Sequence, residues 1–106
     1  MVQFSENLKK LPRTSHLAEI RLYNAAGEIV ATIENKSGSQ GSLAVYNHLA
    51  QTYGAITSEA ASKGLEIFAE HTDDARAHPG RHPHIDRLLA IVETGETLRC
   101  KHVFAL

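Results

Sequence analysis

Residues 17–23 alternate between apolar and polar side chains, and so do residues 28–34, which predicts two strands with one buried face each. In the first strand, Ala18 and every second residue after it lie on the buried face. Asn24 and Gly27 lie between the strands and suit the first and last positions of a type I turn closed by a bulge. The two segments are therefore predicted to form an antiparallel hairpin.

The C-terminal segment, residues 98–106, also alternates and is predicted to be a closing strand. Its apolar side carries Cys100, His102 and Phe104. Since a thiol in apolar surroundings is unreactive, Cys100 is predicted to be a core residue. His102 is predicted to be a partly buried histidine with a polar partner, and acid should destabilise the fold by charging it.

Apolar residues at helical spacing predict two main helices, Leu43–Tyr53 and Pro83–Glu93. Ser42 is placed to cap the first of them. A shorter helix is expected near the N-terminus, where Ser5 can cap it and Pro12 requires it to stop.

The chain between the two main helices allows two interpretations. In the first, a short helix from Ser58 ends at Gly64, and the alternating residues 65–70 form a further strand. In the second, one helix runs from Ser58 to His78 and places Gly64 in its interior, at a cost of roughly 1 kcal/mol relative to alanine. Both interpretations stay open at this point.

Together these elements predict an α+β fold, a single two-layer domain over residues 1–106 in which about four strands are covered by two main helices. The 106 residues, 42% hydrophobic and 22% charged, are typical of one folded soluble domain. The longest apolar run, Leu88–Val92, is too short to span a membrane, and the N-terminal residues do not resemble a secretory signal. We therefore expect a cytoplasmic protein. Its single cysteine excludes an internal disulfide and a zinc ribbon.

Four of the seven histidines lie between Glu70 and Arg87, together with several carboxylates. If residues 71–78 are helical, two histidines and one aspartate there project from the same face. Such a triplet can hold zinc and leave a coordination position for water or substrate. The alternative is a solvated, charged linker, because the spacing matches no established ligand motif. The candidate metal ligands are His71, Asp74, His78, His82 and His84.

The polar loop from Ser37 leads out of a strand and into a helix. Backbone N–H groups at a helix N-terminus can hold an anion, which makes Gly38, Gly41 and Ser42 candidate anion-binding residues. The loop lacks the lysine that follows the second glycine of a P-loop, and an ordinary flexible loop is the alternative interpretation.

A net charge of −1 gives no overall attraction to nucleic acid or to an anionic membrane. Arg76, Arg81 and Arg87 alternate with acidic residues, and the histidine-rich segment has no aromatic residue on which a base could stack. These features disfavour a nucleic-acid partner, and no membrane partner is expected.

The motif PGRHPHIDRLL, Pro79–Leu89, and the surrounding stretch from Phe68 resemble a small family of bacterial proteins catalogued as a domain of unknown function. The resemblance extends over nearly the whole chain. It implies a bacterial cytoplasmic protein and carries over no catalytic residue, cofactor or partner.

Three functional hypotheses follow from these residues. The leading one is a small non-enzymatic binding or accessory domain that meets a protein partner through the segment Glu70–Arg87, since the chain carries no catalytic motif. The alternative is a metal-binding protein or metal-dependent enzyme that uses the His and Asp residues of the same segment. The third is pH sensing, because protonating the four histidines changes the formal charge of this segment from −1 to +3.

Overall fold

The computed structural model describes residues 3–106, which form five helices and three strands. Their bounds are α1 Phe4–Leu8, β1 Leu17–Tyr23, β2 Ile29–Glu34, α2 Gln40–Tyr53, α3 Ser58–Phe68, α4 Glu70–Ala77, α5 Pro83–Thr94 and β3 Arg99–Phe104.

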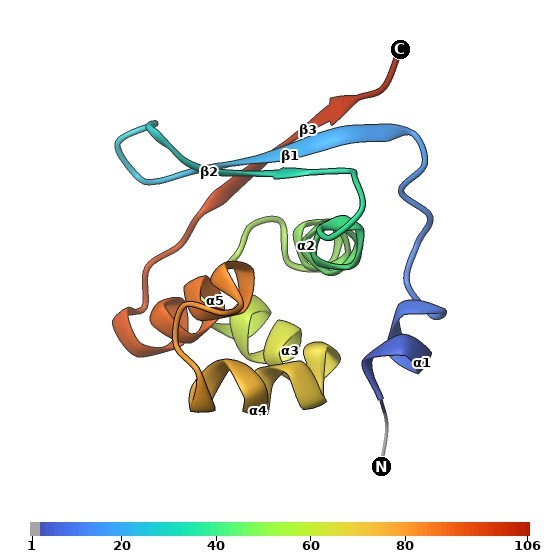
Figure 1. Ribbon diagram of the computed structural model, residues 1–106. Helices are drawn as coiled ribbons and strands as arrows, with labels where there is room; N and C mark the ends of the chain where they lie inside the picture. The colour runs from blue at the N-terminus through green and yellow to red at the C-terminus, as the bar shows by residue number, and fades with distance from the viewer. Residues whose placement is uncertain (1–2) are drawn as a thin grey trace.

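Helix α2 lies between the sheet and the other helices (Figure 1). The sheet is antiparallel with the order β2-β1-β3, and α2 packs against β1 and β2 on one side and against α3 on the other. Helix α5 packs chiefly on α3, and α4 lies beside α5. The predicted α+β class is confirmed, but the two main helices do not cover the sheet together as expected, because α2 packs on β1 and β2 whereas α5 packs chiefly on α3.

The hairpin of β1 and β2 forms as predicted. The N–H of Gly27 donates to the carbonyl of Asn24 at 3.0 Å, and Gly27 has a φ of +82°. The expected position of Ala18 is wrong, because an irregularity in the pairing of β1 with β3 buries Leu17 and exposes Ala18. Phe104 is also not a core residue, since 64% of it is exposed.

The predicted strand over residues 65–70 is wrong, and so is the count of about four strands. Residues 65–68 complete α3, which buries Leu65, Ile67 and Phe68. Six alternating residues are too few to distinguish a strand from a buried helix. The alternative of one helix to His78 is correct for residues 65–68. The helix is interrupted at Ala69, whose φ is +51°, so α4 is a separate helix.

Two of the predicted helix starts also differ. Helix α2 begins at Gln40 after Ser39, so Ser42 lies inside its first turn and does not cap it. Helix α1 begins at Phe4 and not after Ser5, and it ends at Leu8. The earlier start of α2 places the loop glycines at the N-terminal end of the helix.

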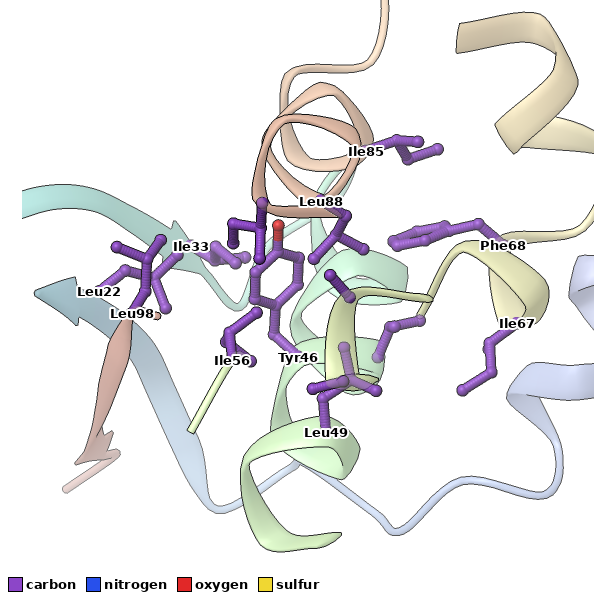
Figure 2. Packing of buried hydrophobic residues seen from close by; sticks show 14 of the residues in the cluster. Leu22, Ile33, Tyr46, Leu49, Ile56, Ile67, Phe68, Ile85, Leu88 and Leu98 are labelled. Carbon is purple, nitrogen blue, oxygen red and sulfur yellow. The ribbon is translucent and has the colours of Figure 1, made fainter. Parts of the chain in front are cut away.

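Tyr46 lies at the centre of the buried cluster, as Figure 2 shows, with no exposed surface. Its hydroxyl donates to the carbonyl of His84 and accepts from Nη1 of Arg87 at 3.2 Å. The buried hydroxyl is thus fully paired, and it connects α2 to the start of α5.

His102 faces α2, as the alternation of the last strand predicts. Its Nε2 lies 3.0 Å from Oδ1 of the fully buried Asn47, and Nδ2 of Asn47 has no partner among residues 3–106. Burial and then the charge of His16 lower the pKa of His102. The unfolded chain therefore binds this proton more readily, and the fold loses stability as the pH falls from about 6.5 through the folded-state pKa. Burial raises the pKa of the neighbouring Cys100 thiol to about 12, in agreement with an unreactive cysteine.

Gly64 allows α3 to approach two neighbouring helices. A Cβ atom at this position would lie 2.8 Å from Cδ1 of Leu49 in α2 and 2.8 Å from Cδ1 of Leu88 in α5. Both leucines are fully buried, so neither has free space into which it could move. The helical propensity lost at this glycine is thus offset by close packing.

Replacing Gly64 with alanine is therefore expected to lower the free energy of unfolding by roughly 1–2 kcal/mol, because overpacking outweighs the gain in helix propensity. Urea denaturation measures the change. The exposed Ser62→Ala in the same helix serves as a control and should stay within about 0.5 kcal/mol of the wild type. A Gly64→Ala protein more stable than the wild type would show that α3 does not pack this closely.

Replacing His102 with leucine is expected to cost about 1–3 kcal/mol, because it leaves the whole amide of Asn47 buried without a partner. The double variant Asn47→Leu/His102→Leu removes both polar groups and should be less destabilised than His102→Leu alone. Thermal and urea unfolding of the two single variants and the double variant measure this coupling. Strictly additive losses would contradict the pairing of these side chains.

Candidate functional site

The candidate anion loop and the histidine-rich segment meet at one pocket of about 480 Å³. The loop and the first turn of α2 form one wall, and the chain from Arg81 to Ile85 forms another. Side chains of α1 and of the end of α3, together with His71 of α4, complete the lining. Residues singled out separately along the sequence are therefore brought together by the fold.

The wall formed by α2 presents the N-terminal end of a 14-residue helix. The N–H groups of Gly41 and Ser42 have no acceptor among residues 3–106, as expected for the first turn of a helix. Gly38 lines the pocket with them. The three predicted anion-binding residues are thus neighbours on one wall, with two free backbone donors among them.

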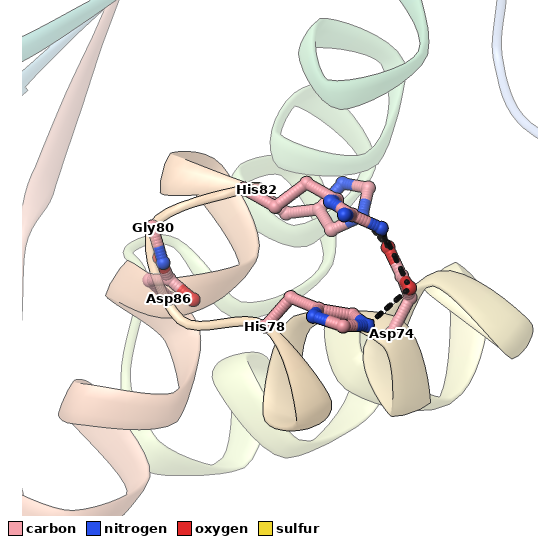
Figure 3. A network of polar contacts seen from close by, with 6 residues as sticks. Asp74, His78, Gly80, His82 and Asp86 are labelled. Carbon is pink, nitrogen blue, oxygen red and sulfur yellow. Dashed lines mark hydrogen bonds and ion pairs between the residues drawn. The ribbon is translucent and has the colours of Figure 1, made fainter.

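The opposite wall is held by Asp74 of α4. Oδ2 of Asp74 lies 2.6 Å from Nε2 of His82, and Nη1 of Arg81 lies 3.3 and 3.4 Å from the two carboxylate oxygens. His78 is more distant, with Nε2 3.9 Å from Oδ1 (Figure 3). The hydrogen bond from His82, followed by the charge of Arg81, lowers the pKa of Asp74, so the carboxylate stays ionised.

The loop that carries Arg81 and His82 has its own anchor. The N–H of Gly80 donates to Oδ2 of Asp86 at 2.9 Å, and both residues appear in Figure 3. Asp86 lies in the first turn of α5, where a carboxylate also favours the positive end of the helix dipole. This contact closes the turn that presents Arg81 and His82 to the pocket.

His84 lies in the first turn of α5 and is held by Arg87 of the same helix. Nη1 of Arg87 lies 3.0 Å from Nδ1 of His84, and because a guanidinium only donates, this ring nitrogen accepts. Burial, and secondarily the charge of Arg87, lower the pKa of His84, so the imidazole is neutral at pH 7. Its proton is then on Nε2.

Aromatic side chains form the third side of the pocket. Phe4 stacks on Phe68 with ring centroids 5.1 Å apart, and His71 meets the edge of Phe4 at 5.2 Å. The N–H of Phe4 donates to Oε1 of Glu70 at 2.8 Å, which docks α1 onto α4. The rings of His71 and His82 are 5.6 Å apart, so the apolar side adjoins the wall that carries Arg81 and His82.

The structure places the five candidate metal ligands in two groups. In the first group, Asp74 contacts His78 and His82, and His71 lies beside the ring of His82. His84 is separate, because its ring contacts Arg87. Among residues 3–106, no group of three or more His, Cys, Asp or Glu side chains is arranged to hold one metal ion. A metal site at these residues stays a prediction.

The sequence did not predict the aromatic side of the pocket, nor the contacts of Tyr46 and Arg87 with His84. Phe4 is more than sixty positions from His71 in the sequence, and nothing in the N-terminal pattern indicates their contact. Tyr46 and Arg87 hold His84, and neither contact is indicated by the helical spacing around Tyr46 or by the charged segment that ends at Arg87. Long-range packing of this kind leaves no local signal.

Comparison with family models shows that the chain belongs to DUF2322, described as an uncharacterised protein conserved in bacteria, whose model matches residues 4–102. The resemblance carried by Pro79–Leu89 is thereby confirmed over nearly the whole chain. No curated protein and no solved structure gives a match.

None of the helices formed by residues 3–106 combines the length and the apolar character that crossing a membrane requires.

The pKa of Asp74 tests the contact between this carboxylate and His82. The hydrogen bond from His82 is the largest cause that lowers this pKa, so replacing His82 with glutamine should raise the pKa of Asp74 toward its ordinary value. Carboxyl-carbon NMR against pH measures the shift. The control His78→Gln should leave the pKa of Asp74 in place, because that side chain lies 3.9 Å away and contributes no resolved shift. Equal effects of the two variants would contradict the geometry of the wall.

Proposed function

We propose that this member of the bacterial family binds a small molecule that carries a phosphate or carboxylate group, and that the pocket between α2 and the Arg81–Ile85 chain is its binding site. The observation that supports this best is the presence of free helix N–H groups and a cationic side chain around one pocket. The proposal keeps the binding-domain hypothesis but replaces its expected protein partner with a small-molecule ligand.

The charges around the pocket favour an anion. The chain has twelve acidic residues and a net charge of −1, yet no Asp or Glu is among the pocket-lining residues of the described chain. Arg81 and three histidines lie there instead. A second surface groove differs, since Glu66, Glu70 and Asp73 line it together with Arg76. Arg81 thus adds a permanent positive charge where the helix dipole is also positive.

The aromatic side indicates the rest of the ligand. Phe4, Leu8 and Phe68 line the pocket away from the polar wall and provide an apolar surface. Pockets for small molecules commonly combine such a surface with a few fixed polar groups. The proposed ligand therefore has an anionic group for α2 and Arg81 and an apolar or aromatic part for the phenylalanines.

Titration with inorganic phosphate, followed by amide NMR, tests the anionic half of this site. The amide signals of Gly41 and Ser42 are expected to shift on binding. Arg81→Gln should weaken the binding by about tenfold, the loss typical of one charge-assisted hydrogen bond.

The matched control is Arg76→Gln, which removes the same charge from the exposed face of α4, outside the pocket. At about 0.15 M salt this variant should change the dissociation constant less than twofold, because distant exposed charges are screened. Equal losses in the two variants would mean unspecific attraction, and unchanged signals at Gly41 and Ser42 would contradict the proposed function.

A further inference from the structure

We propose that the pocket is an acid–base catalytic site in which His82 is the general base and His84 a neutral hydrogen-bond donor, acting on an ester that carries the anionic group. This inference rests on the proposed function for the placement of the substrate. It follows from the way in which the two histidines of this wall use their ring nitrogens, because Asp74 engages Nε2 of His82 whereas Arg87 engages Nδ1 of His84.

His82 is held with its lone pair on Nδ1. The ionised carboxylate of Asp74 only accepts hydrogen bonds, and it lies 2.6 Å from Nε2, so that nitrogen carries the proton. The contact with Asp74 engages Nε2 and leaves Nδ1 as the ring nitrogen that can accept a proton. A carboxylate that fixes the tautomer of a histidine also stabilises the imidazolium formed when the histidine takes up a proton.

In His84 the other ring nitrogen is engaged. Nδ1 accepts from Arg87 at 3.0 Å, so Nε2 carries the proton of a neutral ring. A neutral imidazole N–H can stabilise negative charge that develops on a carbonyl oxygen. A ring nitrogen that can accept a proton and a neutral N–H donor are the two groups that this acid–base chemistry requires.

The reaction that uses these groups is hydrolysis of an ester, with water as the nucleophile. Nδ1 of His82 removes a proton from water as the water oxygen bonds to the carbonyl carbon, and Nε2–H of His84 donates to the resulting oxyanion. The carbon–oxygen bond to the alcohol then breaks, and the alcohol oxygen takes the proton from His82. The products are a carboxylic acid and an alcohol, and both histidines return to their starting state.

His78 provides a matched comparison within the same segment. It lies 3.9 Å from Asp74, is exposed, and does not line the pocket. A variant of His78 therefore removes an imidazole near the same carboxylate without changing the proposed base.

The probe is 4-acetoxybenzoate, which joins an ester to a carboxylate through an aromatic ring, and neutral phenyl acetate is the comparison. Relative to the uncatalysed rates, the protein is expected to accelerate the anionic ester at least tenfold more than the neutral one. His82→Gln should lose about 100-fold or more of this acceleration, the usual contribution of a general base, while His78→Gln stays within twofold. Inorganic phosphate should inhibit competitively.

Nitrogen-15 NMR of the histidine rings in the unmodified protein gives a second test that needs no variant. It should show the proton on Nε2 in both rings, with Nδ1 of His82 free and Nδ1 of His84 hydrogen bonded. A proton on Nδ1 of His82 would overturn the proposal.

The outcomes separate the two proposals. Phosphate binding at Gly41 and Ser42 without acceleration of 4-acetoxybenzoate would overturn the catalytic role and leave the binding function standing. Equal losses in His82→Gln and His78→Gln would also overturn it. Absence of phosphate binding would overturn the binding function itself.

Discussion

The buried hydroxyl of Tyr46 is the contact on which the arrangement of this protein depends. Helix α2 lies between the sheet and the remaining helices, and the hydroxyl links it to the carbonyl of His84 at the start of α5. Burial raises the pKa of Tyr46 to about 12, so the hydroxyl stays protonated and donates throughout the physiological range. One contact inside the core thus fixes the distance between the α2 wall and the histidine wall of the pocket.

The third side of the pocket depends on close approach at Gly41. A Cβ atom there would lie 3.2 Å from two ring carbons of Phe4, so a side chain at this position would press on α1. Phe4 is held in turn by Phe68 and by the carboxylate of Glu70. The pocket is therefore formed by helix packing that also maintains the core, and the groups with binding chemistry lie at the ends of these helices.

The sequence predicts local features of this fold well and long-range features poorly. The hairpin at Asn24–Gly27 and the inward position of His102 follow from turn chemistry and alternation, which act over a few residues. The end of α3 does not, because residues 65–70 fit both the helical and the strand period, and the close packing at Gly64 that selects the helix involves α2 and α5.

The candidate site was likewise predictable only in its local parts. The glycines of the loop and the histidines were each recognisable as candidates, but their meeting, and the part of Phe4 in it, depend on tertiary packing.

The measurement that tests this account most directly is phosphate affinity in Tyr46→Phe, a variant that keeps the buried ring and removes only the hydroxyl. Tyr46 does not line the pocket, so a direct contact with phosphate is absent. The account predicts weaker phosphate binding in the folded variant, with altered amide signals at His82 and His84, because the two walls lose their connection. Unchanged phosphate affinity together with unchanged signals at these histidines would contradict it.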